Sequence, residues 1–187
     1  MALWSAGKPG GIGVESKVLS NLTKLNKFVK DLSEECRDYS VRIGIFATDS
    51  NRKKGEVTNP ELGVIHEFGS PSRHIPKRSF LRMPLDVKSD EILKEVKSGD
   101  NWKNLSHGKP LPVLKDLGHA CEAIIQLAFE TRGFGTWPPD MVSTVDRKTS
   151  RLSPAQRKKA GGYSNSPLID TGQLRRSVTS TVVKNDD

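Results

Sequence analysis

The stretch PVLKDLGHACEAIIQLAFE, from Pro112 to Glu130, carries the clearest helical pattern in the chain and anchors the prediction of its fold. Its apolar residues recur at spacings of three and four, which places them on one face of a helix: Leu114, Leu117, Cys121, Ile124 and Ala128. Polar and charged residues fall on the other face: Lys115, His119, Glu122, Gln126 and Glu130. The pattern predicts a long amphipathic helix that buries one side.

Two segments far from this helix alternate with the period of a β-strand. In YSVRIGIFATD, Val41, Ile43 and Ile45 alternate with Arg42 and Gly44, and near the end of the chain SVTSTVV alternates in the same way. We expect the final strand to pair with residues 41–46. The predicted fold is therefore α+β, with a small, mainly antiparallel β-sheet flanked by two or three long α-helices and a long basic loop.

Four further helical or extended segments are predicted before the long helix. A narrow apolar stripe from Val14 to Cys36 indicates an amphipathic helix, which packs either on the chain's own sheet or on a neighbouring subunit. NPELGVIHEF predicts a short helix with Asn59 as its cap, Pro60 at its first position, and Leu62, Ile65 and Phe68 facing inward. Gly69 is placed to end it in a left-handed conformation. Prolines at 71, 76 and 84 predict an extended segment, followed by a helix over residues 85–96 that buries Leu85, Ile92 and Val96.

The chain of 187 residues is read as one domain with extensions: a flexible N-terminal segment 1–12, a core 13–130, an extended basic loop 131–167, and a closing turn and strand 168–187 that belong to the core. The loop carries Arg147, Lys148, Arg151, Arg157, Lys158 and Lys159, balanced only by Asp140 and Asp146. It is either an arm that becomes ordered on a partner or a solvated loop.

Composition narrows the classes of function. A net charge of +8 and a pI of about 9.6 permit an anionic partner. No stretch has the length expected of a signal peptide's apolar region or a membrane span, so we expect a protein made and kept in the cytosol, or in something assembled there. Cys36 and Cys121 are expected to be buried free thiols, and the histidine spacings fit no metal site. No metal, cofactor or catalytic residue is predicted.

The run SPLIDTGQLRRSV contains an Asp-Thr-Gly that could be mistaken for the active site of an aspartic protease. Such an enzyme needs a second aspartate and a surrounding sheet, yet the motif occurs once and only 15 residues follow Gly172. We therefore expect Asp170 or Thr171 to cap a helical turn while Leu168, Ile169 and Leu174 pack. Replacing Asp170 by Ala should cost about 1 kcal/mol of stability. A loss of hydrolytic activity on that change would contradict this interpretation.

Three motifs in this order resemble the neck and tail-completion proteins of tailed bacteriophages. They are the VRIGIF strand, the segment NPELGVIHEFGSPSRHIPKRSFLRMPLD, and the closing PLIDTGQLRRS, and the likeness runs from about Val41 to Val183. Two features depart from the family's pattern. Ser79 stands where a second proline is common, and the loop between Trp137 and Ser166 is long.

The resemblance implies a structural virion protein, assembled in the host cytoplasm, that forms a ring at the junction of head and tail. The resemblance implies that the ring is a hexamer or a dodecamer. We expect it to meet a tail-tube or tail-terminator protein on one side and a head-tail connector or stopper on the other. We also expect phage DNA to pass through its lumen without specific binding, and no membrane to be involved. The suspected subunit interface comprises Arg73, Ile75, Arg78, Phe80, Leu81, Arg147, Lys148 and Arg151.

Two alternatives stay open at this point. Ile75, Phe80 and Leu81 could serve only the subunit's own core, and the basic side chains of the same segment could simply face water. The whole chain could instead be a small basic DNA-binding accessory protein. The net charge of +8 favours that class, whereas the chain lacks an apparent base-reading helix and an aromatic stacking pattern.

Overall fold

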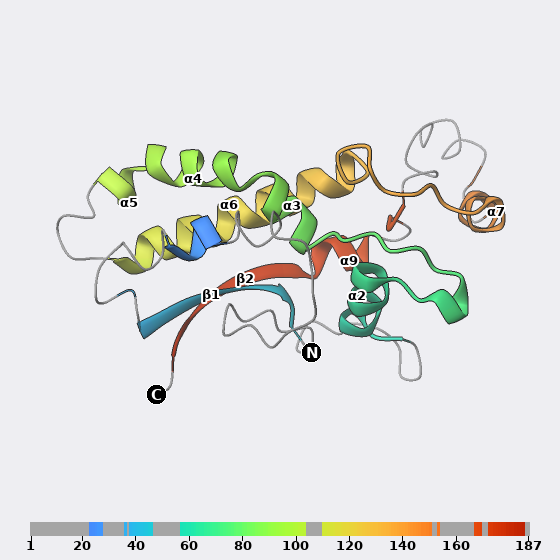
Figure 1. Ribbon diagram of the computed structural model, residues 1–187. Helices are drawn as coiled ribbons and strands as arrows, with labels where there is room; N and C mark the ends of the chain where they lie inside the picture. The colour runs from blue at the N-terminus through green and yellow to red at the C-terminus, as the bar shows by residue number, and fades with distance from the viewer. Residues whose placement is uncertain are drawn as a thin grey trace. The chain divides into compact units, whose positions relative to one another are not determined.

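The computed structural model describes residues 23–27, 36, 38–46, 57–103, 110–150, 153, 167–169 and 172–185. Some predictions lie outside these residues: the segment 1–12, most of the helix from Val14 to Cys36, the loop that follows residue 46, Arg151, the run Arg157 to Lys159, and the proposed caps Asp170 and Thr171. The described chain is α+β and mostly helical, with a two-stranded antiparallel sheet packed against several helices (Figure 1). The predicted fold class is confirmed.

The chain divides into two compact units. Unit 1 contains residues 1–2, 45–80 and 126–178, and unit 2 contains residues 3–44, 81–125 and 179–187. Each unit is therefore assembled from segments that are far apart in the sequence.

The sheet consists of β1, Tyr39–Ile45, and β2, Val178–Lys184, and all but one residue of each strand belongs to unit 2. The two strands pair as the sequence predicts and run side by side in Figure 1. Past the end of β2, the backbone N–H of Asn185 donates to the carbonyl of Asp38 over 2.6 Å. The end of β2 thus lies beside the start of β1.

Helix α6, Pro110–Glu130, is the long helix predicted from the opening pattern, and its residues 110–125 belong to unit 2. It approaches β2 closely at Gly118, where an added Cβ would lie 2.5 Å from Ser180 Oγ. One turn later, the Glu122 carboxylate accepts a hydrogen bond from the backbone N–H of Ser180. The buried face differs slightly from the prediction, because Ile125 is fully buried while Ile124 is half-buried.

The helix predicted over residues 85–96 is two helices in the structure. Helix α3 spans Arg82–Val87 and α4 spans Ser89–Ser98, and α5, Asp100–Lys103, follows. Lys88, with φ −108° and ψ 19°, leaves the helical conformation and separates α3 from α4. Leu85, Ile92 and Val96 are buried as predicted. Residues 23–27 are helical and lie beside α4, with Lys24 Nζ 3.8 Å from Asp90 Oδ1.

Helix α2, Asn59–Phe68, is the first helix of unit 1 among the described residues and corrects two predictions. Its cap is Thr58 rather than Asn59: the Thr58 hydroxyl accepts from Glu61 N, and the Glu61 carboxylate accepts from Thr58 N, forming a capping box. Phe68 faces solvent with 64% of its surface exposed, because the inner face is formed by Asn59, Pro60, Gly63 and Glu67. Gly69 has the expected positive φ of 79°, but its ψ of 171° lies outside the left-handed helical region.

The capping box gives a direct prediction. Thr58→Ala removes the acceptor for Glu61 N and one donor to the Glu61 carboxylate. We expect the free energy of unfolding to fall by about 1 kcal/mol. Chemical denaturation, followed by circular dichroism, measures the change. A variant as stable as the parent chain would show that the box contributes nothing.

The remaining elements of unit 1 are short. They are the 3₁₀ turn η3, Pro71–Arg73, the helix α7, Val142–Ser150, and the helical turn α9, Gln173–Arg176, together with the last turn of α6. Helix α7 lies within the segment predicted as an extended basic loop. The helical turn at TGQLRRS is confirmed, with Leu174 buried and Leu168 and Ile169 half-buried. Its N-cap residue is Gly172, at φ 74°, with no side-chain capping bond.

Helix α9 is fastened to α2 and to the end of α6. It packs against α2, and Arg175 Nε donates to Gln126 Oε1 over 2.6 Å while Gln126 Nε2 donates to the Arg175 carbonyl over 3.0 Å. Arg175 also pairs with Glu130 at 2.5 Å. The turn that resembles a protease motif in the sequence therefore leads into a packing element of unit 1.

Candidate functional site

Residues of the motif segment HEFGSPSRHIPKRSF meet residues of the segment 137–148 in unit 1 in a buried network. We call it the anchor network, and it consists of Glu67, Arg78, Ser79, Phe80, Trp137, Asp140 and Lys148. Glu67 lies on the inner face of α2, one turn after Gly63, and its carboxylate accepts from Ser79 Oγ over 2.5 Å and from Phe80 N over 2.8 Å. Gly63 allows close packing on the same face of α2, since a Cβ there would lie 3.0 Å from Ile45 Cδ1. Helix α2 thereby holds the segment that follows it.

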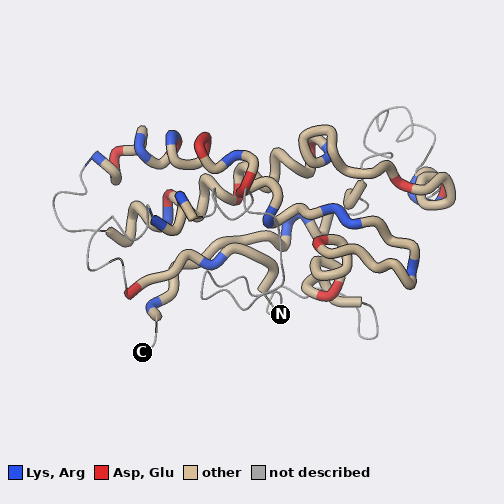
Figure 2. Tube along the Cα trace, in the orientation of Figure 1, with Lys and Arg blue, Asp and Glu red and all other residues tan. Residues whose placement is uncertain are grey.

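Between α2 and the anchor network the chain makes a tight hairpin. Ser70 and Ile75 exchange both backbone hydrogen bonds, at 2.8 and 3.0 Å, around the η3 turn and His74, which adopts a left-handed conformation. Gly69 is required at the base, because a Cβ there would lie 2.9 Å from Lys77 N. The expectation of an extended segment is thus wrong for residues 71–74. The hairpin presents an exposed basic tip (Figure 2).

Asp140 is the centre of the ionic part of the network. Its carboxylate lies 3.2 Å from Arg78 Nη2 and 2.6 Å from Lys148 Nζ, and all three side chains are at most 9% exposed. Arg78 also donates through Nε to the Pro138 carbonyl over 2.9 Å and through Nη2 to the Pro139 carbonyl over 2.8 Å. Burial lowers the pKa of Arg78, and the charge of Asp140 opposes that shift. One carboxylate therefore pairs with two buried cations.

An aromatic stack completes the network. Phe80 and Phe129 have ring centroids 5.4 Å apart, and Phe129 and Trp137 lie at 5.7 Å in an edge-to-face arrangement. The Trp137 indole N–H donates to the Ser79 carbonyl over 3.2 Å. Phe80 and Phe129 are completely buried and Trp137 is 8% exposed. The stack joins the hairpin segment to the end of α6 and to the turn after it.

That turn, Arg132 to Gly135, has four consecutive residues with positive φ, between 55° and 81°. The Gly133 N–H donates to the Ala128 carbonyl over 2.7 Å, and the Trp137 N–H donates to the Arg132 carbonyl over 3.1 Å. Gly133 touches the Trp137 ring, since an added Cβ would lie 2.3 Å from Trp137 Cδ1. A left-handed turn that L-residues avoid thus sets the position of Trp137.

His66 lies beside the anchor network. Arg78 N donates to the His66 carbonyl over 2.8 Å, and the buried Nδ1 of the His66 ring has no hydrogen-bond partner in the described part of the chain. Burial, reinforced by the positive charge of Arg78, lowers the pKa of His66 from 6.5 to about 4. The imidazole is consequently neutral at physiological pH.

The lowered pKa makes stability depend on pH. Between about pH 6.5 and pH 4, the unfolded chain binds a proton at His66 that the folded chain does not. The contribution of His66 to stability is therefore complete above about pH 6.5 and is lost as the pH falls toward 4. We predict that His66→Gln flattens the loss of stability over this window, measured by urea unfolding at several pH values. His119→Gln, at an exposed position, is the matched control and should leave the parent's dependence unchanged. An unchanged pH dependence in His66→Gln would contradict the assignment.

The suspected interface residues divide into two groups. Arg73 and Arg147 are exposed, and Ile75 and Leu81 are half-buried, while Arg151 lies outside the described residues. Phe80, Arg78 and Lys148 are buried in the anchor network. The complete burial of Phe80 agrees with the alternative that this residue serves the subunit's own core. For Arg78, the expectation that it faces water or a neighbour is corrected, because its guanidinium is taken up by Asp140 and two carbonyls.

Sequence reasoning missed the roles of Glu67, Trp137 and Asp140. One signal was available for Glu67: it is an acidic residue at the inner position one turn after Gly63. The Gly-Phe-Gly before Trp137 likewise indicated a backbone turn of unusual conformation. The pairing of Asp140 with Arg78 had no local signal, because the two residues are separated by a long stretch of chain.

The polar side chains of the anchor network bond to one another and to nearby backbone groups inside unit 1. Both cysteines are free and buried, as predicted, and burial raises the pKa of Cys121 to about 12, so its thiol is protonated at neutral pH. Across the described ranges, no group of three His, Cys, Asp or Glu residues could hold a metal ion. None of the described helices combines the length and the apolarity that are needed to span a membrane.

The chain was also compared with known proteins. No protein-family model, curated protein or solved structure matches it.

Proposed function

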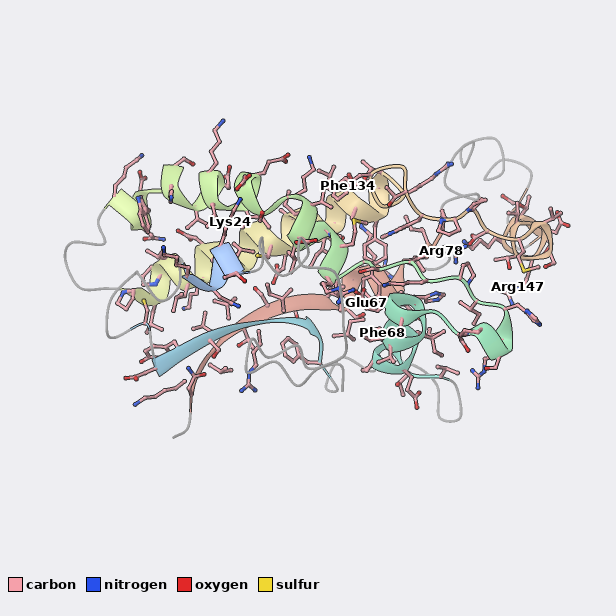
Figure 3. All side chains as sticks on the ribbon, viewed as in Figure 1. Lys24, Glu67, Phe68, Arg78, Phe134 and Arg147 are labelled. Carbon is pink, nitrogen blue, oxygen red and sulfur yellow. The ribbon has the colours of Figure 1, made fainter. Side chains whose placement is uncertain are left out.

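We propose that the protein is a structural subunit of a tailed-bacteriophage particle, which forms a ring at the junction of head and tail and is needed to join them. The observation that carries the proposal is the use made of the motif residues. Glu67 and Arg78, labelled in Figure 3, come from the HEFG and IPKRSF motifs, and their polar atoms are bonded inside the subunit. Motif residues whose polar atoms stabilise the subunit's own fold are more typical of a structural component of a particle than of an enzyme's active site.

The way the network presents the hairpin supports the same role. Glu67 and Ser79 hold its base, and the exposed residues Pro71 to His74 form its tip. A short turn closed by two backbone hydrogen bonds keeps its shape when it meets a partner, so little ordering entropy is lost on contact. In the proposed ring, the partners are neighbouring copies, a tail-tube or tail-terminator protein, and a connector or stopper protein.

Two experiments test the proposal. Sizing with multi-angle light scattering should give a discrete, concentration-dependent oligomer with closed symmetry. Deletion of the gene from the phage that encodes it should give complete but separate heads and tails in electron micrographs. A chain that stays monomeric at high concentration, together with normal infectious particles after deletion, would refute the proposal.

The charge distribution favours a second candidate, a small DNA-binding accessory protein. Unit 1 contains 15 Lys and Arg residues against 8 Asp and Glu residues, whereas unit 2 contains 15 against 14. Nearly all of the net charge is therefore in unit 1, and such a concentration of positive charge attracts phosphate backbones. A monomer that shifts duplex DNA with steep salt dependence would favour this candidate over the ring.

A further inference from the structure

A groove runs between α4 and α6 in unit 2. It has a volume of about 560 Å³ and a floor of small and apolar residues: Ile92, Val96, Ala120, Ala123 and Ile124. Carboxylates stand around it: Glu91, Glu95 and Asp116. Since Ala120 and Ala123 leave space where most residues would fill it, the groove can accept a bulky apolar side chain that is accompanied by positive charge.

The carboxylates of the groove differ in how far they are already engaged. Glu91 pairs with Lys88 at 2.5 Å, and Asp116 accepts a hydrogen bond from Asn101 over 3.0 Å. Glu95 is exposed and makes no side-chain hydrogen bond or ion pair within the described ranges. Of the three, Glu95 is the one that can pair with an incoming cation without losing an existing partner.

Unit 1 presents an exposed apolar surface with positive charge, the kind of surface that the groove can accept. We call it the α2 patch and define it as Val64, Phe68, Arg73 and Lys77. Phe68 and Val64 are one helical turn apart and are 64% and 40% exposed. Lys77 is exposed, and its backbone lies against Gly69, next in the chain to Phe68, while Arg73 is at the hairpin tip. An exposed aromatic side chain beside an exposed cation is a suitable anchor for an interface.

We propose that Phe68 of one copy enters the α4–α6 groove of a second copy, with Lys77 facing Glu95 across the contact. The patch carries the exposed cations Arg73 and Lys77, and the groove is lined by three carboxylates, so the two surfaces are complementary in charge. Because patch and groove are different surfaces, the contact is heterologous, the type that closes rings. This inference rests on the proposed function and names the contact between ring subunits.

Cross-linking gives the direct test. The single variants Val64→Cys and His119→Cys are mixed and treated with a short bismaleimide, because Val64 lies one helical turn from Phe68 and the exposed His119 lines the groove. Both variants keep Phe68, and the native Cys36 and Cys121 do not compete because both are buried. We expect a covalent dimer from this mixture. Val87→Cys, which is 59% exposed and outside the groove, is the matched control and should give no dimer with Val64→Cys. Equal cross-linking in both mixtures, or none in the first, would overturn the inference.

A charge exchange gives an independent test without cross-linking. Glu95→Lys and Lys77→Glu should each lower the association constant at least tenfold, as measured by light scattering over a range of concentrations. The double variant should regain most of the lost affinity. If the parent chain forms a discrete oligomer that neither substitution weakens, the ring remains and this contact is wrong. If the parent chain is monomeric at all concentrations, the contact and the ring both fail.

Discussion

Asp140→Ala is expected to lower the free energy of unfolding by roughly 3–5 kcal/mol, the range for removing one partner of a buried ion pair. The substitution removes the carboxylate that lies 3.2 Å from Arg78 Nη2 and 2.6 Å from Lys148 Nζ, so both buried cations lose an ion-pair partner. The two cations then repel one another in a site from which water is largely excluded. The loss should appear in urea unfolding followed by circular dichroism and tryptophan fluorescence.

Asp146→Ala is the matched control for this prediction. Asp146 is also acidic and lies in α7, close to Asp140 in the sequence, but it is exposed. Its replacement should change stability by no more than about 0.5 kcal/mol. If the two variants unfolded at the same denaturant concentration, the ionic part of the anchor network would be energetically unimportant, and the placement of Arg78 and Lys148 would need another explanation.

Gly133→Ala is the second large effect, with an expected loss of roughly 2–5 kcal/mol. Part of the loss is backbone strain, because φ is 65° at this position and an L-residue is disfavoured there. The rest is a clash: the new Cβ would lie 2.3 Å from Trp137 Cδ1 and Nε1. Trp137 cannot yield freely, since its ring packs on Phe129 and its N–H donates to the Ser79 carbonyl.

Gly135→Ala separates the two contributions. Gly135 has a φ of 81°, but an added Cβ would meet nothing within 4 Å. This variant should therefore show only the strain, about 1–2 kcal/mol. Unfolding experiments on both variants, with the emission maximum of tryptophan as a second measurement, give the comparison. Equal losses, with unchanged tryptophan emission in Gly133→Ala, would mean that Trp137 is not held in place by the turn.

Both predictions concern contacts that fasten the hairpin, so they also bear on the proposed assembly. If the hairpin and Phe68 form the contact with a neighbouring copy, a loosened anchor network should weaken association as well as stability. The two effects can be told apart, because Phe68 is exposed and its replacement should reduce association while leaving the unfolding curve nearly unchanged.

Much of the fold followed from local patterns. The spacing in residues 112–130 predicted α6, and alternation predicted β1, β2 and their pairing, because helical and strand periods are properties of consecutive residues. The same reasoning identified α2 and the buried residues Leu85, Ile92 and Val96. It did not distinguish Thr58 from Asn59 as the cap, since either residue type is favoured at that position and only the backbone decides which one receives the bond.

The candidate site was predicted much less completely. Sequence reasoning selected Arg78 and Phe80 from a motif segment and Lys148 from the predicted basic loop, but it assigned all three to a subunit interface. Which of them are buried depends on the neighbours that they meet in space. Phe68 shows the converse error: it was expected inside, yet the inner face of α2 is taken by Glu67 and Gly63, and the aromatic side chain is left in solvent.

The sequence by itself therefore determined the α+β class, the long helix and the paired strands. Only the tertiary structure decided that Asp140 forms ion pairs with Arg78 and Lys148. It also decided that Gly133 sets the position of Trp137 and that Phe68 is exposed beside a basic hairpin. The physical reason is that periodicity specifies which face of an element is apolar. The partner that meets each face is set by packing between segments that are distant in the chain.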